Sequence, residues 1–196
     1  CNDDGALGRP TGPVDVEDVS KGMKGDENHP ALVGGSGSVL EGQQVMHVSC
    51  GDSQTICLTV EGNVFGWGCY KDKEGRKWFD LEHPSASPKT VKRQQNEPLA
   101  LLGNWAGAVA DLKCGASFNV ALLKDGVVLT WGLGEVGELG RKAAPLRDEA
   151  GEYRFDAIVA EHLNPAQPVL KGGGALPVIK AVGTGMWRKC ARNCFR

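Results

Sequence analysis

The stretch Val45 to Gly68, VMHVSCGDSQTICLTVEGNVFGWG, decides how this chain folds. The chain repeats this stretch without a gap from Val109 to Gly132, as VADLKCGASFNVALLKDGVVLTWG. Eight residues of the first copy recur at the same spacing in the second. The residues of the first copy are Cys50, Gly51, Ser53, Leu58, Gly62, Val64, Trp67 and Gly68. Their counterparts, in the same order, are Cys114, Gly115, Ser117, Leu122, Gly126, Val128, Trp131 and Gly132. A long internal repeat must be recognised before any local prediction, because each copy is expected to form one structural unit.

Two partial copies flank this pair. PVIKAVGTGMW, which ends at Trp187, resembles the beginning of the unit and predicts a third copy that starts at Val178. The first residues, Asn2 to Arg9, mirror the segment Gly134 to Arg141 that follows the second copy. The chain therefore begins inside the tail of a preceding repeat.

Each copy has a period of two rather than 3.6, which favours strands over helices. Ile56, Leu58 and Val60 alternate with other residues, and Glu61-Gly62 then separates them from a second apolar run. The second copy has Asp125-Gly126 at the same place, which is a strong hairpin signal because the turn needs positive φ angles. A third strand is expected before Gly51 in the first copy and before Gly115 in the second. A fourth is expected in the linkers, near Pro88 to Val91 and Gln167 to Leu170.

Three to four antiparallel strands per repeat are typical of a β-propeller blade. The predicted fold class is all-β, a partial β-propeller of about three blades. A β-solenoid is the rival fold, but its repeats are usually much shorter. Trp67 and Trp131 are expected to pack between blades, with ligand stacking as the alternative. Gly51, Gly115 and Gly183 are expected to adopt backbone angles that other residues avoid.

The repeat divides the chain into five segments. Residues 1–9 are the tail of a preceding repeat, and residues 10–44 are an acidic, Gly/Ser-containing linker that we expect to be solvated. Residues 45–108 form a repeat with an insertion at 70–77, where a functional projection is expected. Residues 109–176 form a repeat with a long linker, and residues 177–196 begin a further repeat. Its end, Arg188 to Arg196, fits no repeat and suggests a truncated or mis-joined terminus.

Composition limits the possible functions. Apolar residues make up 41% and charged residues 23%, as in a globular protein, and the net charge of −2 argues against a strongly basic nucleic-acid binder. No run is long enough to span a membrane and no secretory signal opens the chain, so no membrane partner is expected. Seven cysteines without a secretory signal predict a reducing compartment, with Cys50, Cys57 and Cys114 as small buried apolar residues.

The sequence offers no convincing catalytic, cofactor or metal site. Gly132-Leu-Gly134-Glu-Val-Gly137 matches a dinucleotide-binding fingerprint, but Gly140 and Pro145 oppose the helix that such a site needs. Cys190 and Cys194 are two possible metal ligands without a partner pair at zinc spacing. We therefore expect no cofactor, no metal and no covalent catalysis. Asp52, which follows Gly51, has the alternative role of capping a turn.

The repeat resembles that of the regulator of chromosome condensation superfamily. The residues that carry the resemblance are Cys1 to Arg9, Val48 to Thr55, Gly62 to Gly68 and Tyr70 to Gly75. The resemblance implies a seven-bladed propeller. Its founding member is a nuclear, chromatin-associated exchange factor for the small GTPase Ran, which holds Ran on one face and nucleosomes on the other. A short β-wedge of that protein presses near the nucleotide site of Ran.

The resemblance assigns site residues to this chain. The Ran-binding residues would be Asp52, Tyr70, Lys71, Asp72, Lys73, Glu74, Gly75, Arg76, Lys77 and Ser117, of which residues 70–77 would form the wedge. The nucleosome-binding residues would be Lys142, Arg147 and Arg154, within the segment 142–156. The expected location is the nucleus, with the cytoplasm as the alternative.

The chain also departs from the family pattern. Ser117 replaces an aspartate important for exchange, and Gln54 and Phe118 replace expected histidines. These changes weaken the prediction of exchange activity more than the prediction of the fold. The alternative function is a non-catalytic repeat propeller that serves as a protein-interaction scaffold. A tryptophan-based light sensor of the same superfamily is disfavoured, because its Gly-Trp-Arg motifs are not present.

Overall fold

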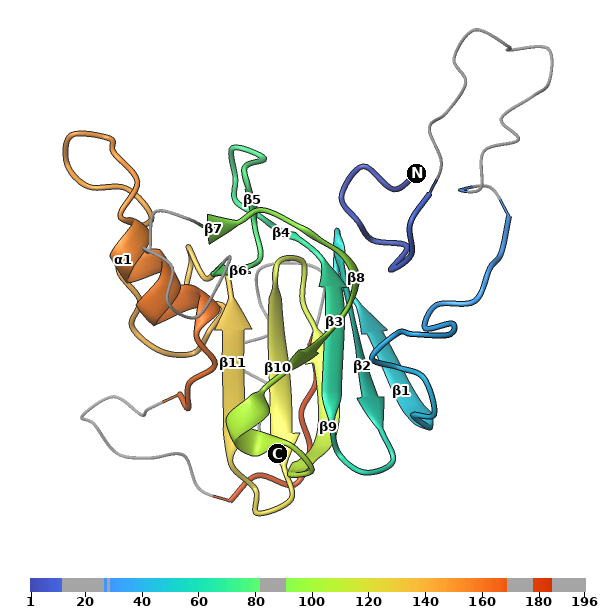
Figure 1. The fold of residues 1–196 in the computed structure, drawn as a ribbon. Coiled ribbons are helices and arrows are strands. Elements are labelled where there is room, and N and C mark those ends of the chain that lie inside the picture. The colour runs from blue at the N-terminus through green and yellow to red at the C-terminus, as the bar shows by residue number, and fades with distance from the viewer. Residues whose placement is uncertain (12–26, 28, 82–90, 169–177, 185–196) are drawn as a thin grey trace, which may run out of the picture.

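The computed structural model describes residues 1–11, 27, 29–81, 91–168 and 178–184, and two antiparallel sheets dominate it (Figure 1). The first sheet has the strand order β1-β2-β3-β8 and the second the order β11-β10-β9. The strands of the first sheet are β1 (Val45–Cys50), β2 (Gln54–Thr59), β3 (Val64–Gly68) and β8 (Gln95–Leu101). Those of the second are β9 (Val109–Cys114), β10 (Phe118–Leu123) and β11 (Val128–Gly132).

Shorter elements lie between and after the two sheets. Two short strand pairs connect β3 to β8, and a short helical segment follows β11. The strand pairs are β4 (Tyr70–Lys71) with β5 (Lys77–Trp78), and β6 (Asp80–Leu81) with β7 (Val91–Lys92). The helical segments are the 3₁₀ turn η3 (Gly103–Trp105), α1 (Phe155–Ala157) and the π-helical η4 (Ile158–Leu163).

The predicted hairpins are confirmed, and individual hydrogen bonds recur at equivalent positions in the two copies. The N–H of Cys69 donates to the carbonyl of Ser53 at 2.9 Å, and the N–H of Leu133 donates to that of Ser117 at 2.8 Å. Both bonds join the residue after a Trp-Gly pair to the turn between the first two strands of its own sheet. The two sheets are therefore copies of one blade rather than merely similar in composition.

The main apolar core lies between the two blades. It combines Ile56 and Leu58 of β2 with Leu112 of β9 and with Leu129 and Trp131 of β11, all of them buried. The first strands of the two blades also approach each other, because the Ser49 hydroxyl accepts a hydrogen bond from the N–H of Cys114 at 2.9 Å. One blade thus completes the apolar surface of the next, as the side-by-side arrangement of a propeller requires.

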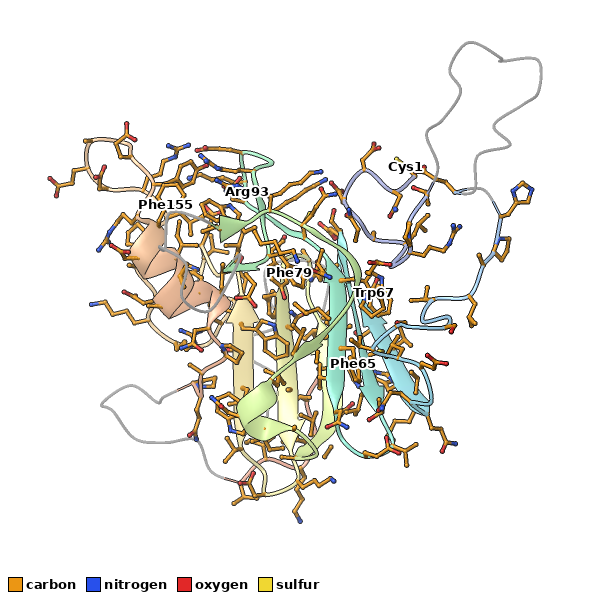
Figure 2. The ribbon with its side chains drawn as sticks, in the orientation of Figure 1. Cys1, Phe65, Trp67, Phe79, Arg93 and Phe155 are labelled. Carbon is orange, nitrogen blue, oxygen red and sulfur yellow. The ribbon has the colours of Figure 1, made fainter. Side chains whose placement is uncertain are left out.

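Trp67 and Trp131 occupy equivalent buried places, as predicted. The Trp67 indole N–H donates to the carbonyl of Ala6 at 3.0 Å, and the indole lies beside the N-terminal segment (Figure 2). The Trp131 indole N–H donates to the hydroxyl of Tyr70 at 3.1 Å. Each indole therefore donates its hydrogen bond to a segment that precedes its own blade in the chain.

The segment predicted to begin a third repeat lies beside the second blade in the same way that β9 lies beside the first. The N–H of Val109 donates to the carbonyl of Gly62 at 3.3 Å, and the N–H of Ile179 donates to the carbonyl of Gly126 at 3.1 Å. Ile179 also packs in an apolar cluster with residues of β10 and β11. Residues 185–196, which include Arg188 to Arg196, lie outside the described residues.

The fourth strand of the first blade is not where the sequence suggested. The segment Gln95–Leu101 forms it as β8, whereas Val91 belongs to the short pair of β6 with β7. Pro98 lies where the pairing of β3 with β8 shifts its register, so the missing N–H of proline leaves no gap in the ladder. In the second blade, Ala166 forms one bridge with Thr130, and residues 169 and 170 of the expected strand are outside the described part.

Parts of the predicted linkers pack against the blades. Leu40 is buried in a cluster with Phe65 and Trp67, so the described end of the 10–44 segment is not simply solvated. Ile158 and Leu163 of the helical segment join the main core. Cys50 is exposed rather than buried, because it ends a strand whose outer side faces solvent.

Candidate functional site

The segment 70–77 forms a hairpin that projects from one end of the two sheets (Figure 1). In its turn, the N–H of Asp72 donates to the carbonyl of Arg76 at 3.1 Å, and the N–H of Gly75 donates to the carbonyl of Asp72 at 2.9 Å. Gly75 has a φ of 80°, a left-handed conformation that favours glycine. Lys73, Glu74 and Gly75 are exposed at the tip, where a partner could contact them.

Asp72 holds this turn together and is only 7% exposed. Its Oδ1 accepts hydrogen bonds from the N–H groups of Glu74 at 3.0 Å and Arg76 at 2.8 Å. Its Oδ2 accepts from the Trp78 indole at 3.1 Å and from the Tyr153 hydroxyl at 3.0 Å. A carboxylate with four donors is a structural anchor, so Asp72 shapes the hairpin from within instead of presenting a free charge.

Tyr70 is a core residue rather than a surface contact, because it is only 2% exposed. Its hydroxyl lies 2.8 Å from the side-chain amide of Asn119 and accepts the indole bond of Trp131. Burial raises the pKa of the Tyr70 hydroxyl. The predicted role of Tyr70 in direct partner binding is therefore replaced by a role in packing the base of the hairpin.

The N-terminal segment ties down the base of the hairpin through one carboxylate. Asp4 makes ion pairs with Lys71 at 2.5 Å and with Lys77 at 3.1 Å. It also accepts a hydrogen bond from the Ser53 hydroxyl at 2.8 Å. Burial acts to raise the pKa of Asp4, but its bonds to Lys71, Ser53 and Lys77 outweigh this and lower the pKa to about 2. Lys71 and Lys77 therefore support the hairpin at its base.

The two other predicted positions, Asp52 and Ser117, lie in equivalent turns at the same end of the sheets. The Ser117 hydroxyl accepts the N–H of Lys71 at 3.1 Å and donates to its carbonyl at 2.8 Å. The N–H of Asp52 donates to the carbonyl of Ala116 at 2.9 Å, while its side chain is exposed. Ser117 thus fixes the hairpin backbone, and Asp52 offers an exposed carboxylate nearby.

Cations and aromatic rings alternate along one side of the hairpin. The guanidinium of Arg147 lies 3.8 Å from the Tyr153 ring centroid, and the guanidinium of Arg76 lies 4.2 Å from the same centroid. Arg76 also lies 5.4 Å from the Trp78 ring, and Arg93 lies 4.9 Å from it. Arg93 comes from beside β7, at the same end of the sheets as the hairpin (Figure 2). We call these five residues the cation–aromatic stack.

The structure brings Arg147, a predicted nucleosome-binding residue, to the predicted Ran-binding hairpin. Its guanidinium makes an ion pair with Glu74, and the hydrogen bond from Arg147 lowers the pKa of that carboxyl. Lys142 and Arg154 have exposed side chains. The segment from Ala143 to Arg147 and the hairpin line a shared cleft of about 250 Å³. The resemblance implied opposite faces for the two partners, whereas Arg147 lies beside the hairpin.

Sequence reasoning missed several residues of this site. Asp4 and Glu135 bind the hairpin from the tails of two repeats, since Glu135 accepts the N–H of Lys73 at 3.0 Å. Their tails were recognised as equivalent, which is the signal that could have placed them. Tyr153 and Arg93 come from linkers without any repeat, so no pattern in the sequence connected them to the hairpin.

Other sites are not supported. No helix follows the Gly132 to Gly137 motif directly, so it lacks the geometry of a dinucleotide site. Within the described ranges, no three acidic, histidine or cysteine side chains gather as metal ligands. No helix in those same ranges is both long and apolar enough to cross a lipid bilayer.

Comparison with known proteins supports the family resemblance. No family model matches the chain. The human protein named regulator of chromosome condensation is 31% identical over 175 residues, which cover 89% of this chain and 34% of that protein. The Xenopus laevis protein of the same name is 36% identical over 159 residues, or 81% of this chain and 31% of that protein. The chain therefore spans about one third of the length of these relatives.

A solved structure agrees with the sequence comparison. Yeast RCC1 (Prp20), in its complex with Kap60, superposes on 85% of this chain with a TM-score of 0.56 and 25% identity, and 32% of that chain is covered. The resemblance to the regulators of chromosome condensation is therefore confirmed. The fold is that of part of a propeller of this type.

The same repeat also occurs in proteins of other kinds. Human E3 ubiquitin-protein ligase HERC2 is 36% identical over 104 residues, which cover 52% of this chain but only 2% of that protein. Mouse serine/threonine-protein kinase Nek9 is 33% identical over 101 residues, or 9% of that protein. Similarity in this repeat thus does not by itself determine activity.

Proposed function

We propose that this chain is part of a guanine-nucleotide exchange factor for the small GTPase Ran. The observation that carries the proposal is the exposed tip Lys73-Glu74-Gly75 on a hairpin whose base is fixed by Asp4 and Ser117. A rigid projection can occupy the region of a nucleotide site without spending affinity on its own ordering. The similarity to the regulators of chromosome condensation supports the same assignment.

The proposed mechanism involves binding only and breaks no covalent bond. The factor would bind nucleotide-free Ran more tightly than nucleotide-bound Ran. Because binding couplings are reciprocal, the factor then weakens nucleotide binding as much as nucleotide weakens binding of the factor. In this proposal the tip and Asp52 contact Ran, while Lys71, Asp72, Arg76, Lys77 and Ser117 hold the tip in place.

We further propose a nuclear, chromatin-associated location, with the cytoplasm as the alternative. The name of the human relative supports an association with chromosomes. Lys142 and Arg154, with exposed cationic side chains, are the candidates for contact with the acidic surface of a nucleosome. Arg147 belongs to the same predicted set but is engaged with Glu74.

The test is the release of fluorescent nucleotide from Ran, measured with the natural protein that contains this chain. A variant with Lys73→Gly and Glu74→Gly, whose tip is then glycine throughout, should lose roughly a hundredfold in exchange rate, because it removes the tip side chains and the contacts of Glu74 with Arg147 and Tyr153. Replacing all of residues 70–77 would be a poor test, because it removes the core residue Tyr70. Wild-type release no faster than the spontaneous rate would overturn the proposal.

A non-catalytic interaction scaffold is the second candidate function. The occurrence of the repeat within HERC2, at 36% identity, favours it, because there the matched region is a small part of a much larger protein. A scaffold would retain its protein partners when the tip is changed to glycines. The same variant of Lys73 and Glu74, tested for both nucleotide release and partner capture, therefore separates the two functions.

A further inference from the structure

The cation–aromatic stack joins the hairpin to a part of the chain far away in sequence. Tyr153 and Arg147 come from the turn after β11, whereas Arg76 and Trp78 belong to the hairpin. Arg76 lies between the Tyr153 and Trp78 rings, with its guanidinium within 6 Å of both. At such distances each cation is attracted to the ring face, and Arg stacks well because its guanidinium is planar.

Two carboxylates of the hairpin reinforce this connection. The Tyr153 hydroxyl lies 3.0 Å from Oδ2 of Asp72 and 3.0 Å from Oε2 of Glu74. Arg147 makes an ion pair with the same Glu74 oxygen. The Tyr153 ring and its hydroxyl therefore engage both the stack and the turn of the hairpin. A hydrogen bond to a charged acceptor is stronger than one between neutral groups, so these contacts favour one hairpin position.

The turn from Arg147 to Tyr153 is itself internally ordered. Asp148 caps it, because its Oδ1 accepts the N–H of Glu152 at 2.9 Å, and its own N–H donates to the carbonyl of Glu152 at 2.9 Å. Arg147 and Tyr153 face each other across an antiparallel bridge. The two side chains that reach the hairpin thus leave from neighbouring points on a closed turn.

We propose that the turn Arg147–Tyr153 is a brace that sets the position of the hairpin tip, with Tyr153 and Arg147 as positioning residues. The brace rests on the proposed function for its effect on exchange, but its effect on the hairpin is independent of that function. The proposal separates Arg147 from Lys142 and Arg154, which carry exposed charges without a place in the stack. Arg147 then serves the hairpin and not a nucleosome.

Hydrogen exchange of the hairpin amides tests the brace directly. The N–H groups of Glu74 and Arg76 are bonded to Asp72, so they report whether the turn opens. Tyr153→Phe keeps the ring but removes both hydroxyl contacts, and Arg147→Ala removes one layer of the stack and the Glu74 pair. Each variant should raise the exchange of these two amides roughly tenfold, the change expected for one lost hydrogen bond.

The matched control is Glu149→Gln, which alters an exposed charge in the same turn without touching the hairpin. Its hairpin amides should exchange as in the wild type. Urea unfolding of each variant must leave the global stability near that of the wild type, so that faster exchange reports local opening. Unchanged amide exchange in both Tyr153→Phe and Arg147→Ala would overturn the brace.

Nucleotide release and nucleosome affinity complete the experiment. With a braced hairpin, Tyr153→Phe and Arg147→Ala should lower the kcat of nucleotide release roughly tenfold while nucleosome affinity stays the same. A loss of nucleosome affinity in Arg147→Ala, with unchanged amide exchange, would contradict the proposal. If wild-type protein releases no nucleotide, the proposed function fails, and faster amide exchange in the variants still supports the brace.

Discussion

Asp72 has the most demanding environment of any residue in the hairpin. Its carboxylate accepts four hydrogen bonds, two from backbone N–H groups and two from Trp78 and Tyr153. Asp72→Ala would leave these donors without a partner in a buried place, so we expect a loss of about 2–4 kcal/mol in the free energy of unfolding. Urea denaturation measures it. The exposed Glu149→Ala should change stability by less than about 0.5 kcal/mol, and an equal loss in both would contradict the role of Asp72.

Asp4 predicts a dependence of stability on pH. Its pKa falls from 3.8 to about 2 in the folded state, because its bonds to Lys71, Ser53 and Lys77 outweigh burial. A depressed carboxyl pKa stabilises the fold above about pH 4, and this contribution is lost as the pH falls towards 2. Asp4→Asn should therefore cost about 1–2 kcal/mol at neutral pH and almost nothing near pH 2. Urea unfolding at both pH values checks this, and a difference independent of pH would exclude the ion pairs as its source.

The sequence predicts which residues are important better than it predicts their structural roles. Gly51, Gly115 and Gly183 were expected to adopt backbone angles that other residues avoid, but none of the three has a positive φ angle. A Cβ at Gly51 would lie 2.4 Å from the carbonyl oxygen of Gly115, and one at Gly115 would lie 2.0 Å from the Phe118 ring. Such close approaches depend on tertiary contacts, which a repeat pattern does not contain.

The hairpin as an element depends on the left-handed turn at Gly75. An alanine there would have free space around its Cβ but would keep the strained φ of 80°. We expect Gly75→Ala to lower the free energy of unfolding by about 1–2 kcal/mol. Gly103→Ala is the matched control, since Gly103 also has free space but no positive φ, and it should be neutral or slightly stabilising. Urea denaturation measures the stability of both variants, and equal stabilities would contradict the role of the strained turn.

Elements with a strict period were predictable and the others were not. The period of two and the Glu61-Gly62 and Asp125-Gly126 turns predicted the inner strands of both blades. The fourth strand of the first blade was predicted at the wrong residues, because Pro98 and its polar neighbours interrupt the alternation of apolar residues in Gln95–Leu101. The strand accommodates the proline because its pairing with β3 shifts register there. The helical segment from Phe155 to Leu163 lies in a linker outside the repeat, and Phe155, Ile158 and Val159 alone are too few apolar positions at helical spacing to predict it.

Contacts between successive repeats join the blades to each other. The tail of one repeat covers the tryptophan of the next, as Ala6 does for Trp67 and Tyr70 does for Trp131. The hairpin is held by the two repeats on either side of its own, through Asp4 of the preceding one and Ser117 and Glu135 of the following one. A projection supported in this way is stable only when neighbouring blades are in place. The position of the candidate site therefore depends on neighbouring repeats and not on a single blade.

This dependence predicts that the two described blades unfold together. Leu112 of β9 is completely buried in the core that both blades share. Leu112→Ala should lower the free energy of unfolding by about 2–5 kcal/mol and leave a single transition, because the cavity destabilises both sheets at once. Tryptophan fluorescence and far-ultraviolet circular dichroism should give coincident urea curves before and after the substitution. Two separate transitions, with Trp67 reporting one and Trp131 the other, would mean that each blade is stable without its neighbour.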